Sequence, residues 1–121
     1  HSFPTRRSSD LLGSSDTTHY ARLINSKAHD WVRRGAKVYY ASVAPVGSRP
    51  GDDTYVSPSG KKVTNAQVRR WNAQMRSKLS SDVKVLDTYN AVLGSYHASD
   101  SLHYDDATYR QLYDFVRRSV T

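Results

Sequence analysis

Helical and strand-like patterns alternate along the chain, and this alternation limits the fold more than any other feature of the sequence. Apolar residues recur at helical spacing over 17–34, 64–79 and 105–116. Two short runs, Lys37–Val43 and Val83–Asp87, are rich in β-branched and aromatic residues, as buried strands are. Strands joined through a helix are expected to be parallel, so the order predicts an α/β domain with a parallel sheet.

Capping and turn residues mark where these elements begin and end. Thr64 and Gln67 have the spacing of a capping box, which predicts the start of the middle helix. Asp105 or Asp106 is expected to cap the last helix. The prolines and glycines between Ala44 and Lys62 predict a long loop.

The helical spacing also predicts which side chains face the core. Three amphipathic faces are too many for a sheet of two strands, so we expect part of the domain to be absent from the chain. The expected core positions are Tyr20, Leu23, Ile24, Ala28 and Trp31, then Val68, Trp71, Met75 and Leu79, and finally Tyr109, Leu112, Tyr113 and Val116, with Tyr39 and Tyr40 on the first strand.

Residues 1–16 show no such period and are interpreted as a poorly structured or non-native lead-in, with residues 17–121 forming the domain. The stretch FPTRRSSDL resembles a translated adaptor of the kind found at the ends of gene fragments. No apolar run approaches the roughly 18–20 residues that span a bilayer, so no membrane span is predicted.

The composition removes several classes of site. The absence of cysteine excludes a disulfide scaffold, a thiolate zinc site and a cysteine nucleophile. His97 and Asp100 lack a nearby third ligand, so no metal site is predicted. His19 and His29 are expected on the surface of the first helix.

The net charge of +7 raises nucleic-acid binding as an alternative function. The paired arginines Arg33-Arg34 and Arg117-Arg118 lie near predicted helix ends, where cations complement the helix dipole. We therefore expect surface arginines and no nucleic-acid partner. A non-catalytic carbohydrate-binding module remains a further alternative.

The strongest chemical signal follows the second strand, at the edge of the sheet where α/β proteins place their sites. Asp100 and His103 are three residues apart in a turn, so that a carboxylate can hold the Nδ1–H of an imidazole and leave Nε2 as a base. A turn-capping Asp beside a surface His is the alternative on spacing alone. Tyr55, Tyr96 and Tyr104 are candidates for rings that line the site.

Four strings spread over about four fifths of the chain resemble the C-terminal half of SGNH/GDSL-type esterases. They are VYYASVAPV (38–46), VTNAQVRRWNAQM (63–75), LDTYN (86–90) and SDSLHYDDATYRQLYDFV (99–116). The resemblance implies a three-layer flavodoxin-like sandwich with a parallel sheet and hydrolysis of acyl esters of carbohydrates or lipids. It also implies that His103 is the base and Asp100 its orienting acid, that no metal or organic cofactor is needed, and that the protein is extracellular.

The chain departs from that family at its N-terminal side. The Gly-Asp-Ser block that carries the family's nucleophile is absent. Asp10 or Leu11 is interpreted as a remnant of the Gly-x-Asn-Asp block of its oxyanion hole, but Ser9 is not assigned as the oxyanion Asn. None of Ser8, Ser9, Ser14 and Ser15 lies at a strand-to-helix elbow, so none is assigned as the nucleophile. We therefore expect a C-terminal fragment of the hydrolase that is inactive alone.

Overall fold

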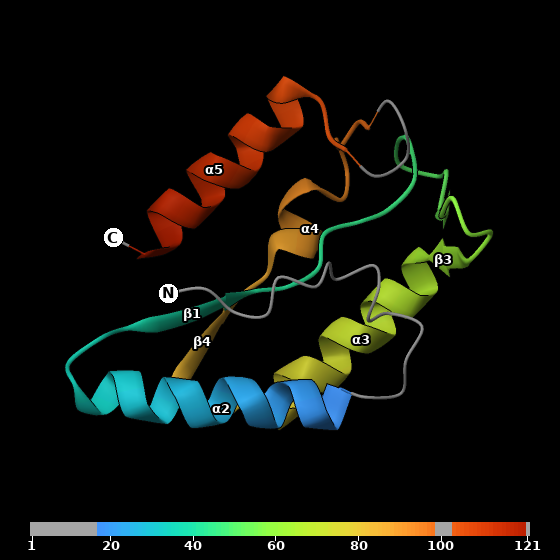
Figure 1. Cartoon of the computed structure of the whole chain (residues 1–121). Helices are drawn as coiled ribbons and strands as arrows, with labels where there is room; N and C mark the ends of the chain where they lie inside the picture. Colours follow the sequence, from blue (N-terminus) through green and yellow to red (C-terminus); the bar gives the residue numbers. More distant parts are fainter. Residues whose placement is uncertain (1–16, 99–102, 121) are drawn as a thin grey trace.

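The computed structural model describes residues 17–98 and 103–120, so the predicted lead-in over 1–16 and Asp100 lie outside the described residues. Helices and strands alternate in the order that the sequence predicts, with one hairpin and one short helix added (Figure 1). The elements are α2 (Thr17–Arg33), β1 (Val38–Ala41), β2 (Thr54–Val56), β3 (Lys62–Thr64), α3 (Asn65–Lys78), β4 (Val83–Leu86), α4 (Thr88–Val92) and α5 (Asp106–Val120).

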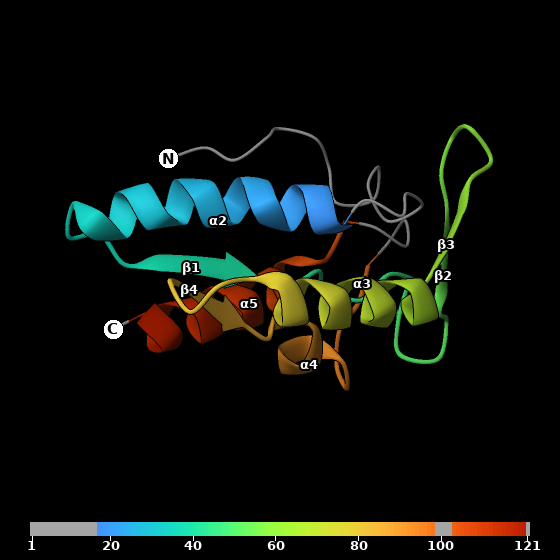
Figure 2. The same cartoon turned by 90° about the horizontal axis from the view of Figure 1, so that it is seen from below.

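The two predicted strands pair in parallel, which confirms an α/β fold with a small parallel sheet. β1 runs beside β4 with Val38 opposite Val83 and Ala41 opposite Leu86. Figure 2 shows α2 on one side of this sheet and α5 on the other. The carboxyl ends of both strands therefore lie at one edge, between helices on either side.

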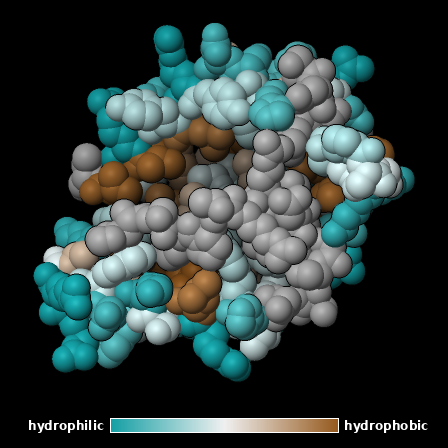
Figure 3. All heavy atoms as spheres, in the orientation of Figure 1, coloured by the Kyte–Doolittle hydropathy of each residue, from teal (hydrophilic) through white to brown (hydrophobic). Residues whose placement is uncertain are grey.

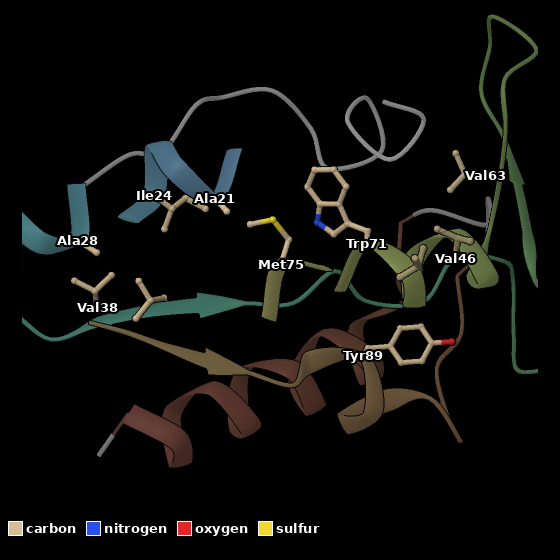
Figure 4. Close-up of a cluster of buried hydrophobic side chains, with 11 residues drawn as sticks. Ala21, Ile24, Ala28, Val38, Val46, Val63, Trp71, Met75 and Tyr89 are labelled. Carbon is tan, nitrogen blue, oxygen red and sulfur yellow. The ribbon is translucent and has the colours of Figure 1, made fainter. Parts of the chain in front are cut away.

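The main core lies between the sheet and the helices α2 and α3 (Figure 4). Ile24, Val68 and Met75 are fully buried there, and Trp31 and Leu79 pack against the cluster from its margin. The predicted apolar faces of the first two helices are thus confirmed. Burying a side chain of this size contributes about 1.5–3 kcal/mol, so these helices are held chiefly by packing.

Local capping signals were also predicted correctly. The Thr64 hydroxyl accepts the Gln67 N–H and the Gln67 side chain accepts the Thr64 N–H, which completes the capping box of α3. At α5 the Asp105 carboxylate accepts the Thr108 N–H at 2.9 Å.

The prediction of a continuous loop over 44–62 is wrong, because part of it forms a β-hairpin. β2 pairs with β3 in antiparallel register, from Thr54 opposite Thr64 to Val56 opposite Lys62. Gly60 adopts a φ of +86° in the turn, and its N–H donates to the Ser57 carbonyl. The strands have only three residues each, too few for a period-2 pattern to stand out. The sequence patterns also do not predict α4, a short helix that Asp87 caps.

The core prediction for the tyrosines of α5 is wrong. Tyr109 is 49% exposed and Tyr113 is 66% exposed, while Leu112 and Val116 are half-buried. A sheet of two strands is too narrow to cover a helix of 15 residues, and α5 packs mainly on α4. Figure 3 shows that some apolar atoms are open to solvent on the face seen in Figure 1. Over the described ranges, no helix is both long and apolar enough to cross a membrane.

Candidate active site

Hydrogen bonds join the two chain segments that leave the carboxyl ends of β1 and β4. The Ser42 N–H donates to the Leu86 carbonyl at 2.9 Å, and the hydroxyls of Ser42 and Thr88 are 3.2 Å apart. Ser42 is buried, and its hydroxyl also accepts the Tyr89 N–H. This serine is therefore a structural link between the strands.

Two asparagines of α3 hold the loop that follows β1. Asn72 accepts the Val43 N–H at 2.9 Å and donates to the Val43 carbonyl at 2.8 Å. Asn65 repeats the pattern on Val46, at 2.7 Å and 3.0 Å. Each amide satisfies both polar groups of one backbone residue, so the loop is fixed although it forms no sheet there.

The segment before α5 is attached to this same loop. The Ala98 N–H donates to the Ser48 carbonyl at 2.8 Å, and the Tyr104 hydroxyl donates to the Pro45 carbonyl. Ala98 and Tyr104 also form an antiparallel bridge. Ala98 and Tyr104 are therefore both held against the loop after β1.

One of the two predicted catalytic residues lies beside the bridge. His103 is exposed and is followed by the anchored Tyr104. Asp100 falls outside the described residues, so its pairing with His103 stays a prediction. Tyr104 is bonded to the loop that leaves the carboxyl end of β1, and α/β proteins bind ligands beyond this edge of a parallel sheet.

A second His–Asp pair, which sequence reasoning missed, lies beside the bridge. The Nδ1 atom of His97 is 3.7 Å from Oδ2 of Asp105, and the Asp105 N–H donates to the His97 carbonyl at 2.8 Å. His97 directly precedes Ala98 and Asp105 directly follows Tyr104, so the bridge brings the two residues together. The sequence does not show this pairing unless the bridge is known. The hydrogen bonds from Thr108 lower the pKa of the Asp105 carboxyl, which also caps α5.

The tyrosines near the site act as anchors. Tyr96 is 1% exposed and its hydroxyl donates to the Val46 carbonyl at 3.0 Å, so it cannot line a substrate pocket. Burial raises the pKa of the Tyr104 hydroxyl, which keeps it protonated as a donor. Tyr55 is half-buried against the main core.

The paired arginines lie near helix ends, as the sequence predicts: Arg33 is in the last turn of α2, and Arg117 and Arg118 are in that of α5. Arg76 and Lys78 also lie in a last turn, that of α3. His19 and His29 are exposed on α2, as expected. The absence of a nucleic-acid partner stays a prediction.

The described part of the site is thus the exposed imidazole of His103, next to Tyr104, which is held on the loop after β1. Among residues 17–98 and 103–120, no three His or Asp side chains gather as a metal site requires. No family model matches the chain, and no curated protein or solved structure matches it either.

Proposed function

We propose that the chain is the C-terminal part of a serine ester hydrolase of the SGNH/GDSL type. Its complete domain is a three-layer flavodoxin-like sandwich, in which further strands extend the sheet of β1 and β4. The four sequence strings that resemble this family support the proposal, and so does the parallel pairing of the two strands. The substrates are acyl esters of carbohydrates or lipids.

One observation carries the proposal furthest. Tyr104, the residue that follows His103, is hydrogen-bonded to the loop after β1 and bridged to Ala98, which is bonded to the same loop. An imidazole next to this anchor is held at the edge where a nucleophile from a neighbouring parallel strand would arrive.

In the proposed reaction a serine outside the described residues attacks the ester carbonyl. His103 takes the serine proton at Nε2 and returns it to the leaving alcohol, while Asp100 holds the Nδ1–H and stabilises the imidazolium. Backbone N–H groups stabilise the oxyanion. A water molecule then attacks the acyl-enzyme by the same proton route, which releases the acid.

The test uses the complete reading frame that contains this chain and an activated acetyl ester as substrate. We expect His103→Ala to lower kcat by at least on the order of 10²-fold, the lower range for general base catalysis. Asp100→Asn should also lower kcat, because the carboxylate no longer selects the tautomer.

His97→Ala is the matched control, because His97 is an exposed histidine on the same segment with its own Asp partner. It should leave kcat unchanged. If His97→Ala loses activity and His103→Ala retains it, the assignment of His103 as the base is wrong. Hydrolysis by the 121-residue chain alone that depends on His103 would contradict a nucleophile outside it.

A further inference from the structure

Tyr104 directly follows the proposed base, His103, in the sequence, and its hydroxyl forms a hydrogen bond with a different segment of the chain. The hydroxyl donates to the Pro45 carbonyl in the loop after β1. The ring packs edge-on against Tyr96 and Tyr109, with centroids 6.1 Å and 5.8 Å away. Both the ring and the hydroxyl are therefore held in one orientation.

The acceptor of this bond is itself on a rigid piece of backbone. Proline has a fixed φ and no N–H, so its carbonyl is the one backbone group of Pro45 that needs a partner. Pro45 and Val46 are buried, and Asn65 holds both polar groups of Val46. A bond to Pro45 therefore fixes Tyr104 relative to β1 and α3.

The geometry of the bridge extends this restraint to His103. His103 lies in a bend directly before the bridged Tyr104, so the fixed backbone of Tyr104 restrains the backbone of its neighbour. Tyr104 is half-buried with its hydroxyl on the loop after β1, whereas His103 is exposed. The anchoring of Tyr104 thus limits the positions that the His103 imidazole can take.

We infer that Tyr104 is a positioning residue whose hydrogen bond to the Pro45 carbonyl orients the His103 imidazole. The effect of Tyr104 on catalysis rests on the proposed function. Its effect on the orientation of the His103 side chain does not depend on that function. Tyr104 contacts no substrate in this scheme and acts through its neighbour.

The experiment compares the ¹⁵N signals of the His103 imidazole by NMR in the 121-residue chain, Tyr104→Phe and Tyr109→Phe. Tyr104→Phe keeps the ring and removes the hydroxyl. We expect it to change the chemical shifts of the His103 imidazole nitrogens and to leave those of His29 unchanged. Tyr109→Phe is the matched control, since its ring stacks on Tyr104 and it is half exposed. It should leave His103 unchanged.

Unchanged His103 signals in folded Tyr104→Phe would overturn the inference. If Tyr104→Phe does not fold, 4-aminophenylalanine at position 104 retains a weaker donor and should give a smaller shift in the same direction; no shift would again overturn it. In the complete reading frame, Tyr104→Phe should lower kcat by on the order of tenfold to a hundredfold with KM unchanged, as expected for a misplaced catalytic group.

The two proposals fail in different ways. If His103 responds to Asp100→Asn but not to Tyr104→Phe, the positioning role is wrong and the proposed function stands. If His103 responds to Tyr104→Phe but His103→Ala retains full activity, Tyr104 orients a histidine that is not the base, and the proposed function is wrong.

Discussion

Asn65→Ala removes the side chain that fixes the loop after β1, and the structure gives the size of the effect. Asn65 is 1% exposed and forms two hydrogen bonds with the backbone of Val46. Its amide also lies 3.2 Å from Oδ1 of Asp53 and 3.4 Å from the hydroxyl of Tyr96. Alanine can form none of these bonds.

The largest loss comes from the Val46 N–H, which is left buried without the Asn65 oxygen and costs about 1–3 kcal/mol. The Val46 carbonyl is affected less, because the Tyr96 hydroxyl still donates to it at 3.0 Å. The remaining bonds contribute about 1 kcal/mol. Asn65 is the first residue of α3, where the higher helix propensity of alanine returns a few tenths of a kcal/mol, about 0.5 at most. We therefore expect the free energy of unfolding to fall by about 1.5–3.5 kcal/mol.

Urea unfolding followed by circular dichroism measures this change. The midpoint should fall by about 1–2 M at an unchanged m-value, because the surface exposed on unfolding stays the same. Arg70→Ala, exposed on the same helix, is the control and should change the free energy by less than about 0.5 kcal/mol. If Asn65→Ala is as mild as this control, the amide does not hold the loop and the reasoning about the site's rigidity is refuted.

Three further changes probe other parts of the structure by the same unfolding assay. Gly47→Ala should be strongly destabilising, because φ is +97° and an added Cβ would lie 1.4 Å from the Asp52 carbonyl oxygen; unchanged stability would contradict this close approach. Tyr113→Ser should cost less than about 0.5 kcal/mol, since the side chain is exposed, and a larger cost would mean that α5 buries its aromatic face. Asp105→Asn should reduce the loss of stability in acid, because hydrogen bonds from Thr108 lower the pKa of Asp105 in the folded protein. The ionised Asp105 therefore stabilises the fold above its pKa in the unfolded chain, and this stabilisation is lost as the pH falls through its pKa in the folded protein. The wild type and Asp105→Asn should therefore differ in how far stability drops from pH 6 to pH 3, and an equal drop would contradict the cap.

Features that depend on neighbours in the sequence were predictable. The capping box of Thr64 and Gln67 lies within one turn, so its residues alone specify it. The parallel pairing of β1 and β4 is less local, but the connection through a helix allows few alternatives.

Features that depend on distant partners were not predictable. Asn65 and Asn72 look like ordinary helix residues, and their roles appear only when the loop after β1 packs against α3, 19 and 29 positions away. The exposure of Tyr113 shows the same limit, since an apolar helix face is buried only where the sheet is wide enough to cover it. At the site, the hydrogen bonds from Tyr104 to Pro45 and from Ala98 to Ser48 join positions far apart in the sequence, so they required the tertiary structure.

The most direct test of the proposed function is the turnover of an activated acetyl ester by the complete reading frame, measured for the wild type, His103→Ala and His97→Ala. We predict a serine-dependent activity that His103→Ala lowers by at least on the order of 10²-fold and His97→Ala leaves unchanged. Equal activity in the wild type and His103→Ala would contradict the assignment of His103 as the base and, with it, the proposed function.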